Sequence, residues 1–299
     1  MSSYTDDWPE AVSFRLGLEA TNRSRRTVET YMDSVRCLHG FLAKGGTAPP
    51  VSQVGPTQIR AFLVDQMSRN SSATAHLRYR ALVRYFKFLL AEEEISANPM
   101  QRVAAPRIVH REIPVLSLEQ IRALLATCSS KRLEDFRDDA ILRLLADTGM
   151  RKSELMGLTL EDIDIEHREV RIFGKGRRFR TVAMSPKTAI SLDRYLRARR
   201  KLPNAQVALL WLTRNSPLGP SGLVTMLRRR GALAGIPGLH PHQLRHSFAH
   251  HWLASGGNES DLMKLAGWTT REMLDRYGAA VAEERARAAH SRLAIGNQL

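Results

Sequence analysis

Apolar residues recur every three or four positions along most of the chain, which is the spacing of amphipathic helices. In the first third, Ser24 is placed to cap a helix that Gly45 and Gly46 end. A second helix is expected from Pro56, and a long third helix from Ser71 or Ser72. The residues of the third helix that we expect to face inward are Leu77, Leu82, Phe86, Leu89 and Leu90.

This periodicity is lost in the segment NPMQRVAAPRIVHREIP, residues 98–114, which holds three prolines and several basic residues. We interpret it as an interdomain linker. The expected division is therefore a helical domain at 8–100, a linker at 101–114 and a second domain at 115–299.

The second domain is expected to open with a Ser-x-x-Gln capping box at 117–120, followed by helical patterns up to a turn at Gly149. The segments EVRIF (169–173) and FRTVAM (179–184) are typical of two strands, joined through GKGRR. Further helices are expected near 186–200, 220–233, 241–255, 259–266 and 270–277. The predicted fold class is mostly α with one small antiparallel sheet.

Composition is that of an ordinary globular protein: 43% of the 299 residues are hydrophobic and 25% are charged, enough for two cores. No apolar run has the length of a membrane span, and the start MSSYTDDWPE lacks the features of a signal peptide. Cys37 and Cys128 lie far apart in the sequence, and we interpret them as reduced core thiols. A cytoplasmic protein without membrane contact is expected.

The formal charge of +15 favours a polyanionic partner, most simply nucleic acid. Basic residues gather within 171–201, where Asp193 is the only acid, and again at Arg228, Arg229 and Arg230. Clusters of this kind favour contact with a phosphate backbone, although a GC-rich genome also raises the number of arginines.

Five of the ten histidines lie in HPHQLRHSFAHHWL, residues 240–253. His242, His246 and His250 share one helical face, which would suit zinc, but no glutamate, cysteine or other carboxylate nearby completes a ligand set. No metal ion is therefore expected. His242 and Arg245 are neighbours on a helix that Pro241 begins, and such a pair at a helix N-terminus suits a phosphate group.

Three other stretches carry candidate chemistry. DTGMRKSELMGL (147–158) puts Arg151 in a turn before a short helix, and FGKGRRFRTV (173–182) puts Lys175 at a glycine-flanked hairpin tip. LAGWTTREMLDRYGAA (265–280) supplies Trp268 and Tyr277. Taken singly, these two aromatic residues are better explained by packing.

Taken together, these residues resemble the tyrosine recombinase, or phage integrase, family. The family pattern is an arginine in Thr-Gly-x-Arg-x-Ser-Glu-Leu, a lysine on a β-hairpin, His-x-x-Arg, a His or Trp after a glycine, and a tyrosine. All six positions are filled in order here, over about 115–280, and Tyr277 follows Trp268 by nine residues. The N-terminal helices resemble the family's SAM-like core-binding domain more weakly. The resemblance implies a C-shaped clamp of two domains on duplex DNA.

The resemblance also implies a role for each residue in cleaving a phosphodiester. Arg151 and Arg245 would bind the non-bridging oxygens, and Tyr277 would attack phosphorus to give a 3′-phosphotyrosyl intermediate. Lys175 would protonate the leaving 5′ oxygen, and His242 would act as base or hydrogen-bond partner.

Trp268 would pack against the site and donate its indole N–H to the phosphate. We infer in addition that Glu154 orients Arg151. No cofactor is expected, because a phosphotyrosyl link preserves the energy of the bond that breaks.

Further expectations concern binding and assembly. A C-terminal helix at about 280–294 is expected to dock on a neighbouring protomer in a tetramer on double-stranded DNA, with an accessory DNA-bending or directionality factor as a possible partner. The expected location is a bacterial cytoplasm, on the nucleoid when DNA is bound. Residues expected to contact DNA are Arg25, Arg26, Arg78, Arg80, Arg84, Arg177, Arg178 and Arg180.

Two roles within the family stay open. The chain starts almost at the core-binding helices, so an arm-binding domain is not expected. This leaves an integrase of a phage or mobile element, or a Xer protein that resolves chromosome or plasmid dimers. We favour the integrase, because Xer proteins usually carry His where this chain has Trp268 and because the C-terminal stretch resembles integrases of actinobacterial elements. A DNA-binding protein without catalysis and a topoisomerase-like relaxing enzyme are the alternatives from other classes.

Overall fold

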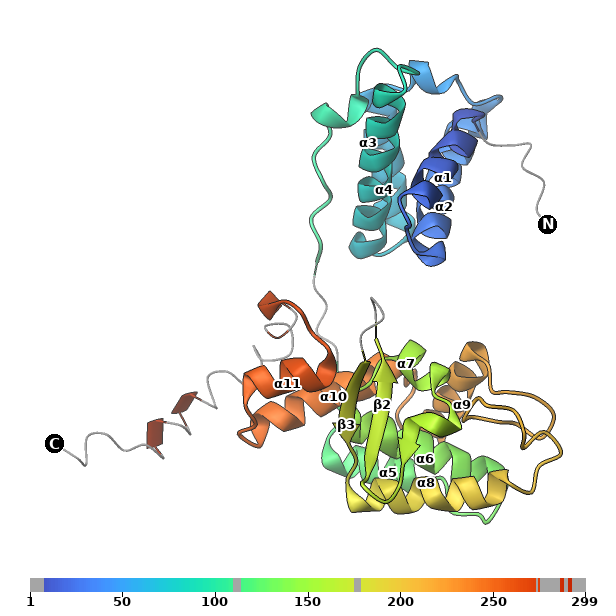
Figure 1. Cartoon of the computed structure of the whole chain (residues 1–299). Helices are drawn as coiled ribbons and strands as arrows, with labels where there is room; N and C mark the ends of the chain where they lie inside the picture. Colours follow the sequence, from blue (N-terminus) through green and yellow to red (C-terminus); the bar gives the residue numbers. More distant parts are fainter. Residues whose placement is uncertain are drawn as a thin grey trace. The chain divides into compact units, whose positions relative to one another are not determined.

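The computed structural model describes residues 8–109, 114–174, 179–272, 274, 286–287 and 290–291. The chain divides into two compact units, Met1–Arg111 and Glu112–Leu299, each with a hydrophobic core of its own (Figure 1). Among the described residues, no helix combines the length and the apolar character needed to cross a membrane.

The N-terminal unit is a bundle of helices. Ser24 and Ser71 are confirmed as helix caps, because each side chain accepts a hydrogen bond from the backbone N–H three residues later. The first helix was not among the expected elements. The helices are α1 (Glu10–Ala20), α2 (Arg25–Leu42), α3 (Pro56–Arg69) and α4 (Ser72–Ala91).

The buried face of α4 differs in part from the expected one. Leu82, Phe86 and Leu89 are buried as predicted, but Leu77 and Leu90 are exposed over 41% and 36% of their surface. The inner stripe of α4 follows Leu82, Phe86 and Leu89, and Leu77 and Leu90 lie beside that stripe rather than on it. The buried face of α4 also includes two small residues and one aromatic residue that were not expected there, namely Ala75, Ala81 and Tyr85.

Part of the proline-containing segment packs on α4. After the short 3₁₀ helix η4 (Pro99–Arg102), Val103 is buried and its carbonyl accepts a hydrogen bond from Tyr79 Oη at 3.0 Å. The Pro106 carbonyl lies 2.9 Å from His76 Nδ1, which donates to it. Two hydrogen bonds and the buried side chain of Val103 therefore hold this stretch against the N-terminal unit.

The C-terminal unit carries the remaining elements, and the helices predicted up to residue 266 and the two predicted strands are confirmed. The third strand, β1, and the short 3₁₀ helix before it were not expected. Of the expected helix at 270–277, Arg271, Glu272 and Leu274 are helical and the other positions lie outside the described residues or outside the helix. The elements are α5 (Leu118–Ala126), α6 (Leu133–Thr148), α7 (Lys152–Gly157), η5 (Leu160–Asp162), β1 (Ile163–Asp164), β2 (Glu169–Phe173), β3 (Phe179–Ala183), α8 (Pro186–Arg199), α9 (Pro220–Leu233), α10 (Pro241–Ala254) and α11 (Glu259–Ala266).

The sheet has the order β1-β2-β3 and is antiparallel throughout (Figure 1). Alternation along the strands buries Val170 and Ile172 on β2 and Val182 on β3. Helix α6 packs against α8 and α10 behind this core. The fold class predicted from the sequence, mostly helical with a small antiparallel sheet, is therefore correct.

Several of the clustered arginines stabilise the fold. Arg230, only 4% exposed, donates through Nε and Nη2 to Asp138 Oδ2 at 2.9 and 2.7 Å. Arg199, 1% exposed, donates to backbone carbonyls, among them Leu210 O at 2.9 Å. The expectation that these clusters as a whole face a phosphate backbone is wrong for Arg199 and Arg230, because buried arginines need partners inside the protein.

Candidate active site

Arg151 and Glu154 are joined at the start of α7. Arg151 is the N-cap residue, and its backbone N–H donates to Glu154 Oε2 at 2.7 Å. This is the contact by which a glutamate at the third helical position stabilises a helix start. The Arg151 side chain reaches the same carboxylate, with Nη1 at 2.9 Å from Glu154 Oε1. Glu154 therefore contacts both the backbone and the side chain of Arg151, as the predicted orienting role requires.

A second arginine binds the same carboxylate. Arg180 donates through Nη1 to Glu154 Oε1 and through Nη2 to Oε2, both at 2.9 Å. Burial of Glu154 by itself raises the pKa, but the hydrogen bonds and charge of Arg180, together with the bonds from Arg151, lower the pKa of this carboxyl to about 2. Glu154 is thus an anion at neutral pH.

The C-terminal end of α11 collects three arginines. Arg180 Nε donates to Leu265 O at 2.9 Å, Arg245 Nη2 to Ala266 O at 2.7 Å, and Arg151 Nη2 to Gly267 O at 2.8 Å. The last carbonyls of a helix have no partner within the helix and attract cations. We call these three arginines, Glu154 and the three carbonyls the arginine cluster.

Backbone geometry explains why these carbonyls are available. Gly267 ends α11 in the left-handed conformation, with φ at 63°, and the N–H groups of Gly267 and Trp268 bond to Lys264 O and Met263 O. A Cβ at position 267 would lie 3.2 Å from Nη1 of both Arg151 and Arg180. Glycine is thus required here both for the turn and for the close approach of the guanidinium groups.

Arg245 is almost fully buried, at 2% exposure, beside Trp268. Its second contact is from Nη1 to Gly149 O at 2.5 Å, and its guanidinium lies 5.4 Å from the centre of the Trp268 ring. A cation over an indole face at this distance is attractive. The ring of Phe248 fills the space that a side chain at Gly149, whose φ is 58°, would need.

His242 lies in the first turn of α10, one turn before Arg245, and is exposed. Partial desolvation of its ring, and then the charge of Arg245, lower the pKa of His242. Lys152 and Arg151 act in the same direction, so they lie close enough to contribute. The ring is therefore neutral at neutral pH, the form that can accept a proton.

The other histidines of this stretch have structural positions. His240 caps α10 through Nδ1, and His251 Nε2 donates to Leu116 O at 2.8 Å. His246 is buried, and burial lowers its pKa to about 4. Within the described ranges, no group of three or more His, Cys, Asp or Glu side chains is arranged to hold a metal ion.

Several predicted residues cannot be placed from the described part of the chain. Lys175, Arg177, Arg178 and Tyr277 lie outside the described residues. The expected C-terminal helix at 280–294 also lies mostly outside them, although Ala286, Arg287, His290 and Ser291 are helical. Of the site residues predicted from the sequence, the structure therefore places five in one region: Arg151, Glu154, His242, Arg245 and Trp268.

The predicted DNA-contacting arginines differ in exposure. Arg25, Arg26, Arg80 and Arg84 are exposed on the N-terminal unit, whereas Arg78 is half-buried. Arg180 departs most from the expectation, because its guanidinium is held by Glu154 and Leu265 O inside the arginine cluster.

Two members of the site were not expected from the sequence. Arg180 was expected to contact DNA rather than residues inside the protein, and Gly267 was not expected to have a role. The signal for Arg180 was the alternation in FRTVAM, where position 180 shares a face with the apolar Val182 and Met184. The signal for Gly267 was its place directly after the last residue of a predicted helix.

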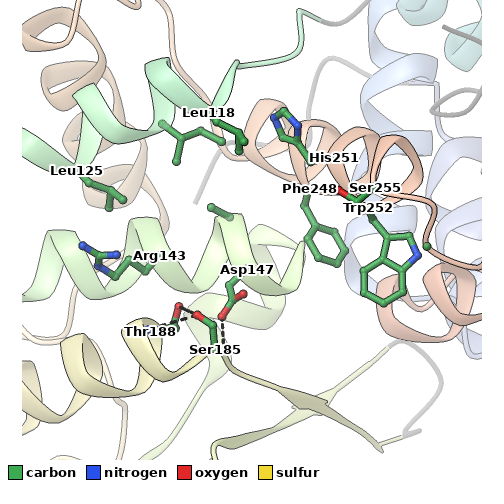
Figure 2. Close-up of a pocket in the computed structure, with 13 residues that line it drawn as sticks. Leu118, Leu125, Arg143, Asp147, Ser185, Thr188, Phe248, His251, Trp252 and Ser255 are labelled. Carbon is green, nitrogen blue, oxygen red and sulfur yellow. Dashed lines mark hydrogen bonds between the residues drawn. The ribbon is translucent and has the colours of Figure 1, made fainter. Parts of the chain in front are cut away.

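The C-terminal unit also has a cavity of about 520 Å³, lined mainly by apolar residues of α5 and α10 and polar residues of α6 and α8 (Figure 2). Asp147, in its wall, accepts a hydrogen bond from the backbone N–H of Ser185 at 2.7 Å. Arg143 is paired with Asp139. No member of the arginine cluster lines this cavity, so the charge that could bind an anion lies elsewhere.

The arginine cluster sets one carboxylate against three guanidinium groups, in a partly enclosed setting. Backbone carbonyls supply only partial negative charge, so a positive excess is left at Arg151, whose side chain is 31% exposed. Such an arrangement fits an anion with several oxygens, as a phosphodiester has.

Comparison with known proteins identifies the class. A model of the phage integrase family matches residues 114–284, more than half of the chain, and a model of the phage integrase N-terminal SAM-like domain matches residues 13–93. The chain belongs to the phage integrase, or tyrosine recombinase, family of enzymes that cleave and rejoin DNA. The family resemblance of the sequence analysis is confirmed.

Its curated relatives include Xer proteins. Tyrosine recombinase XerC of Actinobacillus pleuropneumoniae is 31% identical over 246 residues, covering 82% of this chain and 80% of the relative. Tyrosine recombinase XerD of Shewanella oneidensis is 31% identical over 255 residues, covering 82% of each.

Solved structures with the same fold include DNA complexes. The Tn1549 transposon integrase with transposon right end DNA has a TM-score of 0.75 and 19% identity, covering 95% of this chain and 99% of that one. XerH bound to a palindromic difH substrate has a TM-score of 0.73 and 18% identity, covering 94% and 84%.

Proposed function

We propose that this protein is a site-specific DNA recombinase that cleaves and rejoins duplex DNA through a 3′-phosphotyrosyl intermediate on Tyr277. The observation that supports it best is the arginine cluster, in which Arg151 and Arg245 are held on the carbonyls of adjacent residues, Gly267 and Ala266. Two guanidinium groups fixed so close together can bind both non-bridging oxygens of one phosphodiester.

The proposed cleavage step is an in-line displacement. Tyr277 Oη forms a bond to phosphorus, the bond from phosphorus to the 5′ oxygen breaks, and the charge that grows on the phosphate is stabilised by Arg151 and Arg245. His242, neutral at pH 7, accepts the tyrosine proton or a hydrogen bond, and Lys175 donates a proton to the 5′ oxygen.

Trp268 packs beside Arg245. In the proposal, its indole N–H donates a hydrogen bond to the phosphate. Rejoining is the reverse reaction, in which a 5′-hydroxyl attacks the phosphotyrosyl bond and Tyr277 leaves. One phosphate ester replaces another in each direction, so the step balances without an energy-supplying cofactor.

Substrate binding is proposed to use both units on one duplex, as in a C-shaped clamp. Residues 8–100 would form the core-binding domain, 101–114 the linker and 115–299 the catalytic domain. Arg25, Arg26, Arg80 and Arg84 would contact phosphates, and Arg177 and Arg178 would do so near the active site. Strand exchange requires two duplexes, hence a tetramer, and we propose that the segment at 280–294 joins the protomers. An accessory DNA-bending or directionality factor is part of this proposal.

Two biological roles fit this chemistry. The Xer role, resolution of chromosome or plasmid dimers, is favoured by the identity of 31% to XerC and XerD proteins. The integrase role is favoured by Trp268, at a position where Xer proteins usually carry histidine. The location of the natural target distinguishes them: a site at the ends of a mobile element supports integration, and one site per chromosome or plasmid supports dimer resolution.

Covalent trapping tests the proposed function. Binding sites are first selected from a duplex library with a randomised centre by using Tyr277→Phe, which should bind DNA but not cleave it. Nicked suicide versions of these sites are then incubated with the wild-type protein, and adducts are resolved on denaturing gels. A metal-independent adduct that Tyr277→Phe does not form supports the proposal. Tight binding without an adduct would indicate a DNA-binding protein without catalysis.

Strand exchange tests the remaining alternative. Two selected sites in direct repeat on one plasmid should recombine to give two circles. Relaxation of supercoils without recombination would favour the topoisomerase-like alternative over the recombinase.

A further inference from the structure

The position of Arg180 on the sheet is the first observation. Arg180 lies on β3 opposite Ile172 of β2, and both belong to the face on which Val170 and Val182 are buried. Its strand neighbours Phe179 and Thr181 are exposed on the opposite face. The side chain therefore points inward, and only 17% of it is exposed. An arginine on the inner face of a strand needs a partner within the protein.

The partner is matched to guanidinium geometry. Both Nη atoms of Arg180 bind the two oxygens of Glu154, while Nε binds Leu265 O, so one planar group connects β3, α7 and the end of α11. A lysine ammonium is a single compact charge and cannot make this bidentate contact. The arrangement thus specifies arginine rather than a positive charge alone.

Glu154 depends on this contact. The carboxylate has four hydrogen-bond donors around it, two from Arg151 and two from Arg180. Its side chain is only 4% exposed, so these protein donors rather than bulk water stabilise its charge. Without Arg180, the carboxylate has fewer donors and the burial that raises its pKa is opposed less, which weakens the anion that orients Arg151.

We propose that Arg180 is a positioning residue for DNA cleavage, which fixes the Glu154 carboxylate and the end of α11 so that Arg151 and Arg245 are held ready for the phosphate. This inference rests on the proposed function. It replaces the expectation that Arg180 contacts DNA directly.

The experiment compares Arg180→Lys and Arg180→Gln with the wild type. The matched control is Arg122→Gln, which also removes an arginine charge from the C-terminal unit but at an exposed pair with Glu119. For each protein we would measure the rate of covalent adduct formation on the selected suicide substrate, the affinity for DNA at several salt concentrations, and thermal unfolding.

We expect both Arg180 variants to lower the cleavage rate about 10- to 100-fold, because small displacements of catalytic groups cost factors of this size. The salt dependence of DNA affinity should stay unchanged, and Arg122→Gln should cleave as the wild type does. Arg180→Lys keeps the positive charge, so it tests the bidentate contact in a variant that is less prone to lose the fold. A slope of log affinity against log salt that is smaller by about 0.9 in Arg180→Gln would instead assign a phosphate contact and overturn the proposal.

A pH profile separates positioning from a merely structural role. On acidification the cleavage rate of Arg180→Gln should start to fall at a higher pH than that of the wild type, because Glu154 then takes up a proton at a higher pH. Glu154→Gln combined with Arg180→Gln should abolish this acid dependence. A cleavage rate in Arg180→Gln equal to that of the wild type at every pH would overturn the proposal.

A measurement without DNA keeps the inference apart from the proposed function. The Glu154 carboxyl of the full chain is followed by carbon NMR during acid titration in wild type and Arg180→Gln. The pKa should be raised in the variant, and an unchanged pKa overturns the inference. If the wild-type protein forms no adduct on any selected site, the proposed function fails while this titration still decides whether Arg180 controls Glu154.

Discussion

Two groups of arginines in the C-terminal unit gather around carboxylates that are buried or partly buried, but they leave different residual charge. In the Asp138 cluster, Arg137, Arg229 and Arg230 share two carboxylates, Asp138 and Asp135. The arginine cluster has a single carboxylate, Glu154, and backbone carbonyls complete it. By formal charge, three arginines against two carboxylates leave +1 in the first group, whereas three against one leave +2 in the second, and the larger excess suits an anionic substrate better.

Exposure varies within each group, and the Arg229 side chain of the Asp138 cluster is 54% exposed. The Arg230 side chain is 5% exposed and Asp138 is fully buried, whereas 31% of the Arg151 side chain reaches the surface. Charge counted along a sequence therefore says little about binding until each arginine is matched with its partner.

The largest effect is expected at the Asp138 cluster. Asp138→Asn removes the central carboxylate from buried arginines, and uncompensated buried charge costs about 3–5 kcal/mol. Urea unfolding should show this loss in the C-terminal unit. Arg122→Gln, which breaks an exposed pair with Glu119, serves as the control and should unfold as the wild type does. Equal stability of Asp138→Asn and wild type would contradict the structural role of this cluster.

Arg151→Lys should act on chemistry rather than on the fold. We expect covalent adduct formation to fall about 100- to 1,000-fold, since the lysine keeps a charge but loses a donor directed at the phosphate. Urea unfolding should change far less than in Asp138→Asn. If Arg151→Lys cleaves at the wild-type rate, the arginine cluster is not the phosphate site.

Acid should weaken the arginine cluster in a defined range. Burial opposes ionisation of Glu154, but its arginine partners lower the pKa from 4.5 to about 2 in the folded chain. A lowered folded-state pKa stabilises the protein above the unfolded value, and this contribution is lost as the pH falls from about 4.5 through 2. Its full size is roughly 3 kcal/mol. Denaturant unfolding at stepped pH should show a shallower acid dependence in Glu154→Gln, and parallel curves would contradict this assignment.

The smallest effect is expected at the surface of the N-terminal unit. Arg25, whose side chain is 94% exposed, pairs with Glu29 one turn away. Arg25→Gln should leave thermal unfolding unchanged but lower the slope of log DNA affinity against log salt by about 0.9. An unchanged slope would remove Arg25 from the proposed DNA contacts.

Local signals in the sequence predicted most of the fold. The caps Ser24, Ser71 and Ser117 are where expected, because capping depends on residues within one turn. The two-residue strand β1 carried no readable period, and Leu77 and Leu90 were misassigned because a leucine beside an apolar stripe resembles one within it.

The candidate site was only partly predictable for a different reason. Arg151, His242, Arg245 and Trp268 stand in recognisable local contexts. The role of Arg180 depends on Glu154 and Leu265, which are far from it in sequence. Partner choice at such separations is set by tertiary packing, and no local pattern encodes it.

The end of α11 has a consequence for how the enzyme matures. Arg151, Arg180 and Arg245 are all translated before Leu265, Ala266 and Gly267, the residues on which they converge. A nascent or truncated chain that stops short of α11 contains every arginine of the cluster but lacks the backbone carbonyls that bind them. The arginine cluster can therefore assemble only after residues 265–267 have been synthesised.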